Sequence, residues 1–162
     1  MYPNYLFEKY RNKGVLIDTN LLLLVAVGTY STARVLSWKR TKQYTLEDYA
    51  MLLKILGYFQ RRVTTPNILT EVDNLARQLP VVEHEAISTV LFQLISSSIE
   101  VYVASVDVAQ SHMYPAVGLA DCVTMSAADE VLVLTDDFEL SNRLASIGRD
   151  VLNINHIRNW TF

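Results

Sequence analysis

The segment GVLIDTNLLLLVAV (residues 14–27) decides how the chain is expected to fold. Its first residues, 14–17, predict a short buried strand, and an apolar helix is expected from about Asn20. Asp18 stands between the two and is the only formally charged residue between Lys13 and Arg34. A charge placed so near an apolar interior needs a partner, and aspartate is also a favoured residue before a helix. Both interpretations of Asp18, helix cap and functional acid, are open.

The same alternation of short strands and helices continues through the chain. Further strands are predicted at residues 62–65, 99–104, 131–134 and 151–154, and helices at 45–60, 65–79, 83–97, from 105, from 118 and at 138–147. The segment from Thr29 to Tyr44 is expected to be a loop. This alternation predicts a three-layer α/β/α fold with a parallel sheet of about five strands. We expect the order 3-2-1-4-5, with any ligand at the carboxyl ends of the strands.

Length and composition favour one compact intracellular domain. The chain has 162 residues, of which 51% are hydrophobic and 19% charged, and this balance excludes a disordered chain. A single cysteine, Cys122, rules out an internal disulfide and suits the reducing cytoplasm. The longest apolar run, residues 21–27, is too short to span a bilayer, and residues 1–13 do not resemble a signal peptide. We expect a single domain over residues 1–162 with no membrane partner.

Several other acids stand at positions that predict a site. Asp121 is the only charged residue between Val108 and Ala128, in an apolar helical segment, although the helix dipole could explain an acid in its first turn. Asp136 and Asp137 follow the strand at 131–134, as caps of the next helix or as ligands. Glu71 lies beside the apolar stripe of the helix at 67–79 and is either a surface residue or an acid that faces a cleft. Asp73 is expected to face away.

Together these acids predict a metal site. If the strands are parallel neighbours, the acids that follow them converge, and carboxylates packed together repel one another. A hard divalent cation such as Mg²⁺ or Mn²⁺ relieves that repulsion and also binds phosphate oxygens. The formal net charge of −3 does not favour nucleic-acid binding, but a carboxylate site lowers the total by itself.

Four short motifs, in order, resemble those of the PIN-domain family. They are VLIDTN at 15–20, TPNILTEV at 65–72, GLADC at 118–122 and LTDD at 134–137. The resemblance covers the chain from Gly14 to Ile154. A response-regulator receiver shares the early acids, but it needs an Asp after the third strand and a Lys after the fifth, and both are missing here.

The resemblance implies a PIN-like fold and a Mg²⁺- or Mn²⁺-dependent endoribonuclease, with water attacking the phosphorus in line. The catalytic and metal-binding residues that it implies are Asp18, Glu71, Asp121 and Asp137, with Asp136 as an auxiliary ligand and Thr19, Asn20 and Thr135 as orienting residues. Many bacterial relatives are VapC-type toxins held by an antitoxin protein, so an antitoxin partner and a homodimer stay open. The alternative is a catalytically inactive PIN fold that binds nucleic acid or protein.

Two segments depart from the compact toxins, an N-terminal extension at 1–13 and a basic excursion at 29–44. In the excursion, Arg34, Lys39, Arg40 and Lys42 are predicted to bind RNA, and Trp38 and Tyr44 suit stacking on bases, with a solvated loop as the alternative. The remaining expectations are minor ones: His84, His112 and His156 are not ligands, Cys122 is a small buried hydrophobe, and Trp160 and Phe162 pack on the body or form an oligomer contact.

Overall fold

A five-stranded parallel sheet forms the centre of the molecule, as the sequence predicts. The computed structural model describes residues 2–158, with side chains from residue 4 onward. The strands are β1 (Val15–Ile17), β2 (Arg62–Thr64), β3 (Ser98–Glu100), β4 (Leu132–Thr135) and β5 (Val151–Asn153). Their order is β3-β2-β1-β4-β5, and Leu16 of β1 is in register with Val63 of β2 and Val133 of β4. The strand order reverses beside β1, so the carboxyl ends of β1 and β4 are neighbours where such sheets bind ligands.

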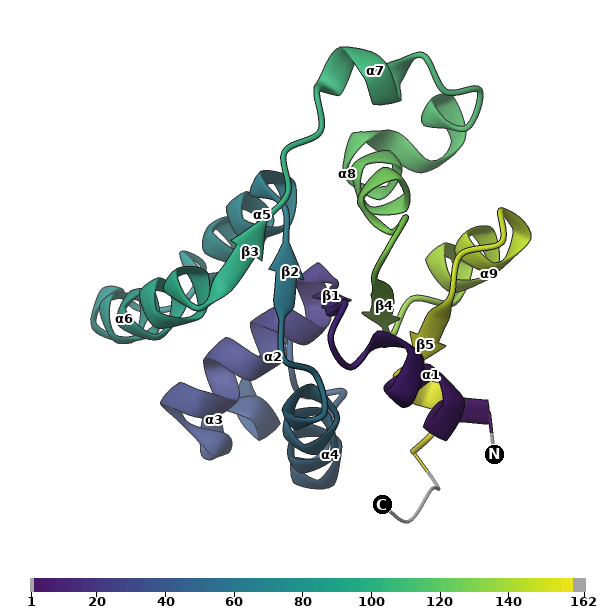
Figure 1. The fold of residues 1–162 in the computed structure, drawn as a ribbon. Coiled ribbons are helices and arrows are strands. Elements are labelled where there is room, and N and C mark those ends of the chain that lie inside the picture. The colour runs from purple at the N-terminus through teal and green to yellow at the C-terminus, as the bar shows by residue number, and fades with distance from the viewer. Residues whose placement is uncertain (1, 159–162) are drawn as a thin grey trace.

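Helices flank the sheet and complete a three-layer α/β/α fold (Figure 1). They are α1 (Tyr2–Tyr10), α2 (Thr19–Tyr30), α3 (Thr32–Ser37), α4 (Leu46–Gly57), α5 (Pro66–Ala76), α6 (Val81–Ser96), α7 (Ser105–Ala109), α8 (Tyr114–Ala127) and α9 (Phe138–Ser146), with a 3₁₀ turn at Ile154–His156. Among the residues described, no helix is long and apolar enough to cross a membrane.

The centre of the fold is apolar in the way that the opening segment predicts. Every residue of β1 and β4 is buried, and so is every residue of α2 from Leu21 to Gly28. A helix that is hydrophobic on all sides belongs inside a protein. Helix α4 packs closely on α2 at Gly28, because a Cβ atom added to this glycine would lie 2.4 Å from the ring of Tyr49. The acid at the start of α2 is therefore held on a rigid element.

The prediction of a loop at 29–44 is wrong in its first half. Helix α2 continues to Tyr30, and α3 begins one residue after Ser31. Ser31 is extended, and its hydroxyl accepts a hydrogen bond from the backbone N–H of Arg34 at 3.3 Å, so this residue ends one helix and caps the next. The local mixture of Ser, Thr and basic residues resembles a loop because it is the exposed side of a short helix.

The aromatic residues of the same segment are part of the core. Trp38 is 6% exposed and Tyr44 is 2% exposed, so neither ring is available to stack on a base. Burial of a large aromatic side chain is a strong driving force for folding. The prediction of a stacking platform at these two residues is therefore corrected.

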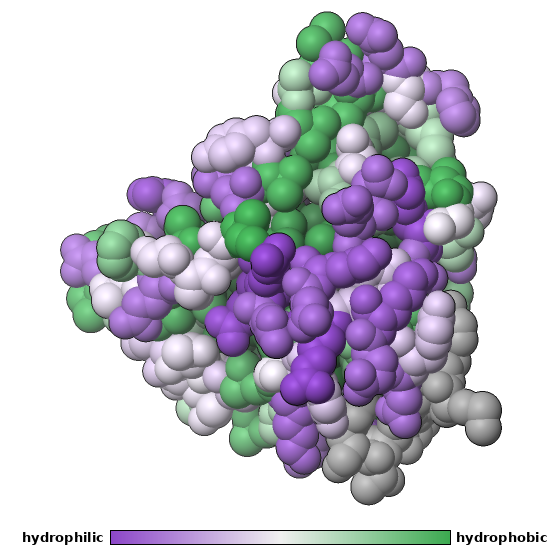
Figure 2. Space-filling model, viewed as in Figure 1, coloured by the Kyte–Doolittle hydropathy of each residue, from purple (hydrophilic) through white to green (hydrophobic). Residues whose placement is uncertain are grey.

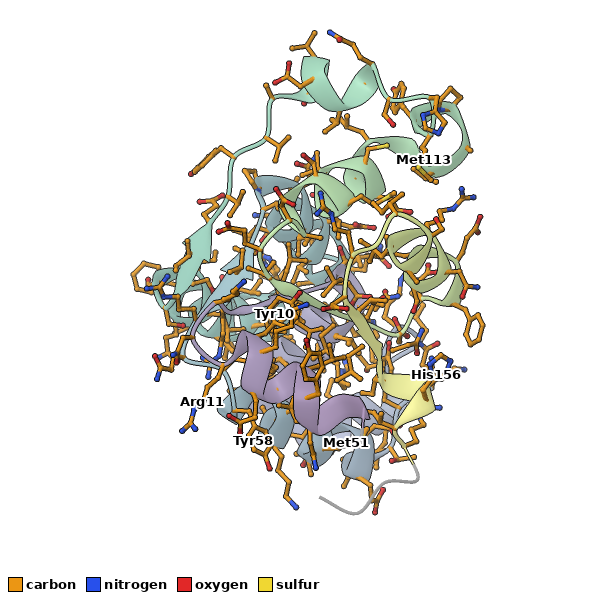
Figure 3. All side chains as sticks on the ribbon, turned by 45° about the vertical axis from the view of Figure 1, so that its right-hand side comes forward. Tyr10, Arg11, Met51, Tyr58, Met113 and His156 are labelled. Atoms are coloured by element: carbon orange, nitrogen blue, oxygen red, sulfur yellow. The ribbon has the colours of Figure 1, made fainter. Side chains whose placement is uncertain are left out.

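The N-terminal extension is a helix that packs on the body. Leu6, Phe7 and Tyr10 of α1 are buried, and Figure 3 shows Tyr10 on the inner side of that helix. The Tyr10 hydroxyl donates to Asp150 Oδ2 at 2.9 Å, and Lys9 Nζ lies 2.6 Å from the same oxygen. Helix α1 is thereby tied to the segment that enters β5. Trp160 and Phe162, expected to pack on the body, lie outside the described residues.

At two further boundaries the structure differs from the sequence-based prediction by four residues. The third strand ends at Glu100 rather than at residue 104. The helix expected from Gly118 begins at Tyr114, but Gly118 interrupts it with a φ of 82° that favours glycine. The regular part of α8 therefore starts after Gly118, and Asp121 falls in its first turn.

Candidate metal centre

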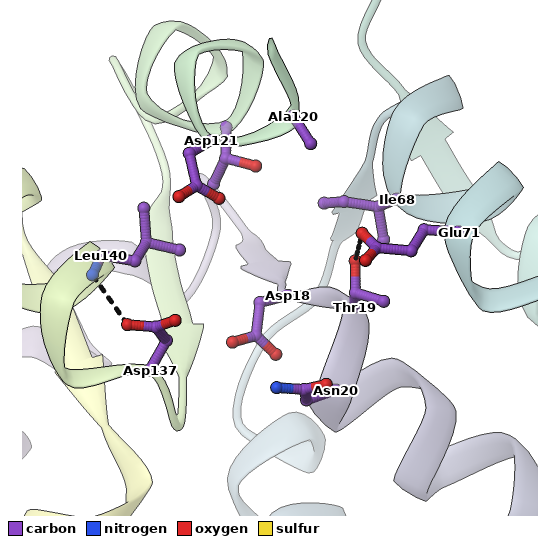
Figure 4. Close-up of a pocket in the computed structure, with 10 residues that line it drawn as sticks. Asp18, Thr19, Asn20, Ile68, Glu71, Ala120, Asp121, Asp137 and Leu140 are labelled. Atoms are coloured by element: carbon purple, nitrogen blue, oxygen red, sulfur yellow. Dashed lines mark hydrogen bonds between the residues drawn. The ribbon is translucent and has the colours of Figure 1, made fainter. Parts of the chain in front are cut away.

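Four of the predicted acids line one pocket of about 130 Å³ (Figure 4). Asp18 follows β1, Glu71 lies on α5, Asp121 on α8, and Asp137 precedes α9. We call these four carboxylates and the space between them the acid pocket. No Lys or Arg is among the described residues that line it; the other lining residues are Thr19, Asn20, Ile68, Ala120, Thr124 and Leu140. The topology thus brings together acids that are up to 119 positions apart in the sequence.

Asp18 caps α2 and also lines the acid pocket. Its Oδ1 accepts from the backbone N–H of Leu21 at 3.0 Å, which caps α2. Its Oδ2 accepts from the Thr135 hydroxyl and from the backbone N–H of Asp136 at 3.3 Å. The side chain is 7% exposed, and burial, followed by the charge of Asp136, raises the pKa of Asp18 to about 7. Its three partners are all neutral donors, so no cation within the described chain offsets its charge.

Asp137 is both the cap of α9 and a wall of the acid pocket. Its Oδ1 accepts from the backbone N–H groups of Glu139 at 2.7 Å and Leu140 at 2.9 Å. Figure 4 shows its other carboxylate oxygen on the side that faces Asp18. The cap fixes the carboxylate and leaves one oxygen directed into the pocket.

Glu71 faces the pocket and Asp73 does not, as the helical stripe predicts. The Thr19 hydroxyl donates to Glu71 Oε2 at 2.9 Å, and this bond ties α2 to α5 at one side of the pocket (Figure 4). Asp73 instead pairs with Arg77 of the same helix at 2.8 Å and lies 3.7 Å from His84 of α6. Thr19, which the family resemblance implies as an orienting residue, is therefore hydrogen-bonded to one of the four acids.

Asp121 differs from the other acids because no hydrogen bond or ion pair reaches its carboxylate from residues 2–158. The side chain is half-buried, and burial raises its pKa, with further contributions from the charges of Asp137 and Glu71. The positive charge of Arg143 acts in the opposite direction on that pKa. Arg143 itself pairs with Glu139 on its own helix. The acid pocket therefore holds a carboxylate with two acidic neighbours and no donor.

Asp136 does not line the acid pocket, although the resemblance implies an auxiliary ligand there. Asn20 Nδ2 donates to its Oδ1 at 3.2 Å, and the Tyr44 hydroxyl donates to its Oδ2 at 2.5 Å. Burial, with the bond to Asp136, raises the pKa of Tyr44 far above its usual range. Asn20 and Tyr44 therefore hold Asp136 beside the pocket rather than in it.

Two residues that support the site are missing from the sequence-based prediction, and a third has another role than the predicted one. Asn153 Nδ2 donates to the backbone carbonyl of Asp137 at 3.1 Å, and Asn155 Nδ2 donates to that of Asp136 at 2.8 Å. Tyr44, described above, is the third. Asn153 is the last residue of β5 and Asn155 lies in the turn that follows, so polar residues at the end of the fifth strand were a signal that could have identified them.

The predicted RNA-binding residues are in unequal surroundings. The guanidinium of Arg34 binds both carboxylate oxygens of Glu83 on α6. Arg40 donates to Gln78 at 3.2 and 3.3 Å, whereas Lys39 and Lys42 are exposed. The turn that carries Lys42 returns to the strand ends, because Tyr44 reaches Asp136 there.

The remaining expectations concern residues outside the acid pocket. His84, His112 and His156 are absent from its described lining. Cys122 is buried, as expected. His84 instead lies near Asp73 and Ser88, and the ring of His156 packs against Phe138.

The donor set of the acid pocket fits a hard divalent cation. All four acids offer carboxylate oxygen, the ligand atom that Mg²⁺ and Mn²⁺ prefer. The carboxylate of Asp121 also accepts no hydrogen bond from the described residues, so both of its oxygens are free to bind a cation. Among the residues described, however, no three Asp, Glu, His or Cys side chains are close enough to form a ready metal cage. The carboxylates thus surround a space without closing on it. Comparison with models of protein families and with curated proteins found no match for this chain.

Proposed function

We propose that the protein hydrolyses phosphodiester bonds of RNA with Mg²⁺ or Mn²⁺ held by Asp18, Glu71, Asp121 and Asp137. The resemblance to PIN domains suggested the activity, and the acid pocket supports it. The observation that carries the proposal is Asp121, a half-buried carboxylate with no donor and with Asp137 and Glu71 as acidic neighbours. Such an arrangement is unfavourable unless a positive charge enters the pocket.

The chemistry follows from the donors at hand. A divalent cation, when bound, supplies the positive charge that polarises water and a phosphoryl oxygen. In the hydrolysis, the water oxygen forms a bond to phosphorus and gives up a proton, the bond from phosphorus to the leaving nucleotide oxygen breaks, and that oxygen takes up a proton. The chain contributes positioning: Thr19 holds Glu71 and Thr135 holds Asp18. Such fixed groups reduce the reorganisation needed to reach the transition state.

A second candidate function is a catalytically inactive PIN-like module that binds nucleic acid or protein. One observation favours it, namely that no three acids of the described chain form a ready metal cage. The two candidates differ in their need for a metal, since only the enzyme requires the four carboxylates to bind an ion.

Cleavage of an unstructured, end-labelled RNA by the purified protein separates the two candidates. We expect cleavage with Mn²⁺ or Mg²⁺ and none with excess chelator, and we expect Asp121→Asn to lower the rate at least 100-fold. Asp107→Asn is the matched control, because Asp107 is an exposed acid on α7 outside the acid pocket. Equal activity of wild type and Asp121→Asn, or none in either, would overturn the proposal and leave the binding module.

A further inference from the structure

A second, larger cavity adjoins the acid pocket. It has a volume of about 650 Å³ and shares Glu71 and Ala120 with the acid pocket. Its walls come from α5, from the start of α8 and from the segment between β3 and α7. Figure 2 shows hydrophobic residues gathered between that segment and α8. We call this cavity the side groove.

The side groove differs in chemistry from the acid pocket. Apart from Glu71 at the shared edge, no charged residue is among the described residues that line it. It therefore offers no cation for a phosphate group. Its lining combines apolar surface with uncharged polar groups, which is the combination that an uncharged, flat and polar-edged ligand requires.

Three side chains in the side groove suit a nucleobase. Tyr102 is 76% exposed, so the face of its ring is open to a ligand, and its hydroxyl donates to Glu100 at 2.8 Å. The amides of Asn67 and Asn74 make no hydrogen bond within the described part of the chain. Each free amide presents a donor and an acceptor, which can match the edge of an unpaired base, and an exposed aromatic ring can stack on the face of the base.

Resting on the proposed function, we infer that the side groove binds an unpaired nucleobase of the RNA, next to the phosphodiester that enters the acid pocket. Tyr102 stacks on the base, and Asn67 and Asn74 contact its edge. Sharing of Glu71 and Ala120 places the two cavities in direct succession, as consecutive groups of one RNA strand require. The groove then selects single-stranded RNA, because a base in a duplex is stacked and paired.

The test measures equilibrium binding, so that it does not depend on cleavage. A fluorescent unstructured RNA is titrated in chelator and in Ca²⁺, alongside a series in which one nucleotide at a time is abasic. We expect Tyr102→Ala to weaken binding about tenfold and Tyr102→Phe to stay within about twofold of wild type. One abasic position should weaken wild-type binding similarly, and Tyr102→Ala should add no further loss on that RNA. Tyr5→Ala, an exposed tyrosine on α1, is the matched control.

The outcomes separate the two proposals. RNA cleavage with no coupling between Tyr102 and any abasic position overturns the base subsite and leaves the nuclease intact. Coupled binding without metal-dependent cleavage supports the subsite and overturns the nuclease. Absence of RNA binding by wild type overturns the subsite, whatever the cleavage assay shows.

Discussion

Thr135, the last residue of β4, donates its hydroxyl hydrogen to Oδ2 of Asp18, the residue that follows the neighbouring strand β1. The same hydroxyl oxygen accepts from the backbone N–H of Asp137 at 2.9 Å. One buried hydroxyl thereby positions two of the four acids. Thr64, the last residue of β2, is also buried, but its hydroxyl has no partner within the described residues.

Replacing Thr135 with Val should therefore destabilise the protein, whereas the same change at Thr64 should not. Thr135→Val removes a donor from buried Asp18 and an acceptor from the Asp137 N–H, at a cost of about 1–3 kcal/mol. Thr64→Val removes a hydroxyl that has no partner and should leave the free energy of unfolding equal or higher. Urea denaturation of both variants measures the difference, and equal losses would show that the Thr135 bonds are not what matters.

Neutralising Asp121 should stabilise the metal-free protein. Asp121→Asn removes a charge that faces Glu71 and Asp137 and has no donor to lose. The loss of this repulsion should raise the free energy of unfolding by roughly 1 kcal/mol, or Tm by about 2–4 °C for a chain of this size. Thermal melts in chelator measure it. With Mn²⁺ added, wild type should gain stability and the variant should not; a variant that is less stable in chelator would contradict the repulsion.

The stability of the metal-free protein should fall as the pH rises from about 4 to about 7. Burial raises the pKa of Asp18 from 3.8 to about 7, so the unfolded chain loses this proton first. Between these values the folded state binds more protons, and the free energy of unfolding decreases with pH. The contribution is fully present below pH 3.8 and is lost above about pH 7, a change on the order of 4 kcal/mol.

Urea denaturation in chelator across this pH range tests the assignment. At low pH the Asp18→Asn variant should have a lower free energy of unfolding than wild type. All three partners of Asp18 are hydrogen-bond donors, and the amide nitrogen of Asn cannot accept from them. The free energy of unfolding of this variant should nevertheless change less with pH than that of wild type. The raised pKa of Asp121 should leave part of that slope in place. An unchanged slope in Asp18→Asn would mean that another group titrates.

The basic excursion should divide into structural and RNA-contacting residues. Arg34→Ala breaks the pair with Glu83 and should lower stability more than it changes RNA binding. The double change Lys39→Ala and Lys42→Ala should lower the slope of log K against log salt by about 2. Lys54→Ala, an exposed lysine on α4, is the control. Equal slopes for the double variant and the control would exclude the excursion from the RNA path.

The sequence by itself determined the layout of the fold and the position of the acids along it. Short apolar strands that alternate with helices admit few topologies, and right-handed parallel connections reduce them to the order observed. Asp18 and Asp121 could be identified because burying an isolated charge in an apolar segment costs free energy unless a partner or a ligand compensates for it. These inferences depend only on neighbours along the chain, which is the range over which a sequence pattern is informative.

Only the tertiary structure decided which oxygens face the acid pocket and which partners hold them. Asp136 and Asp137 are adjacent in sequence, yet Tyr44 and Asn20 hold the first beside the pocket while the second lines it. Trp38 is locally indistinguishable from an exposed stacking residue, but packing buries it. The physical reason is the same in each case. A hydrogen bond or a packing contact between residues tens of positions apart depends on how the helices pack on the sheet, and the local sequence around either residue does not determine that packing.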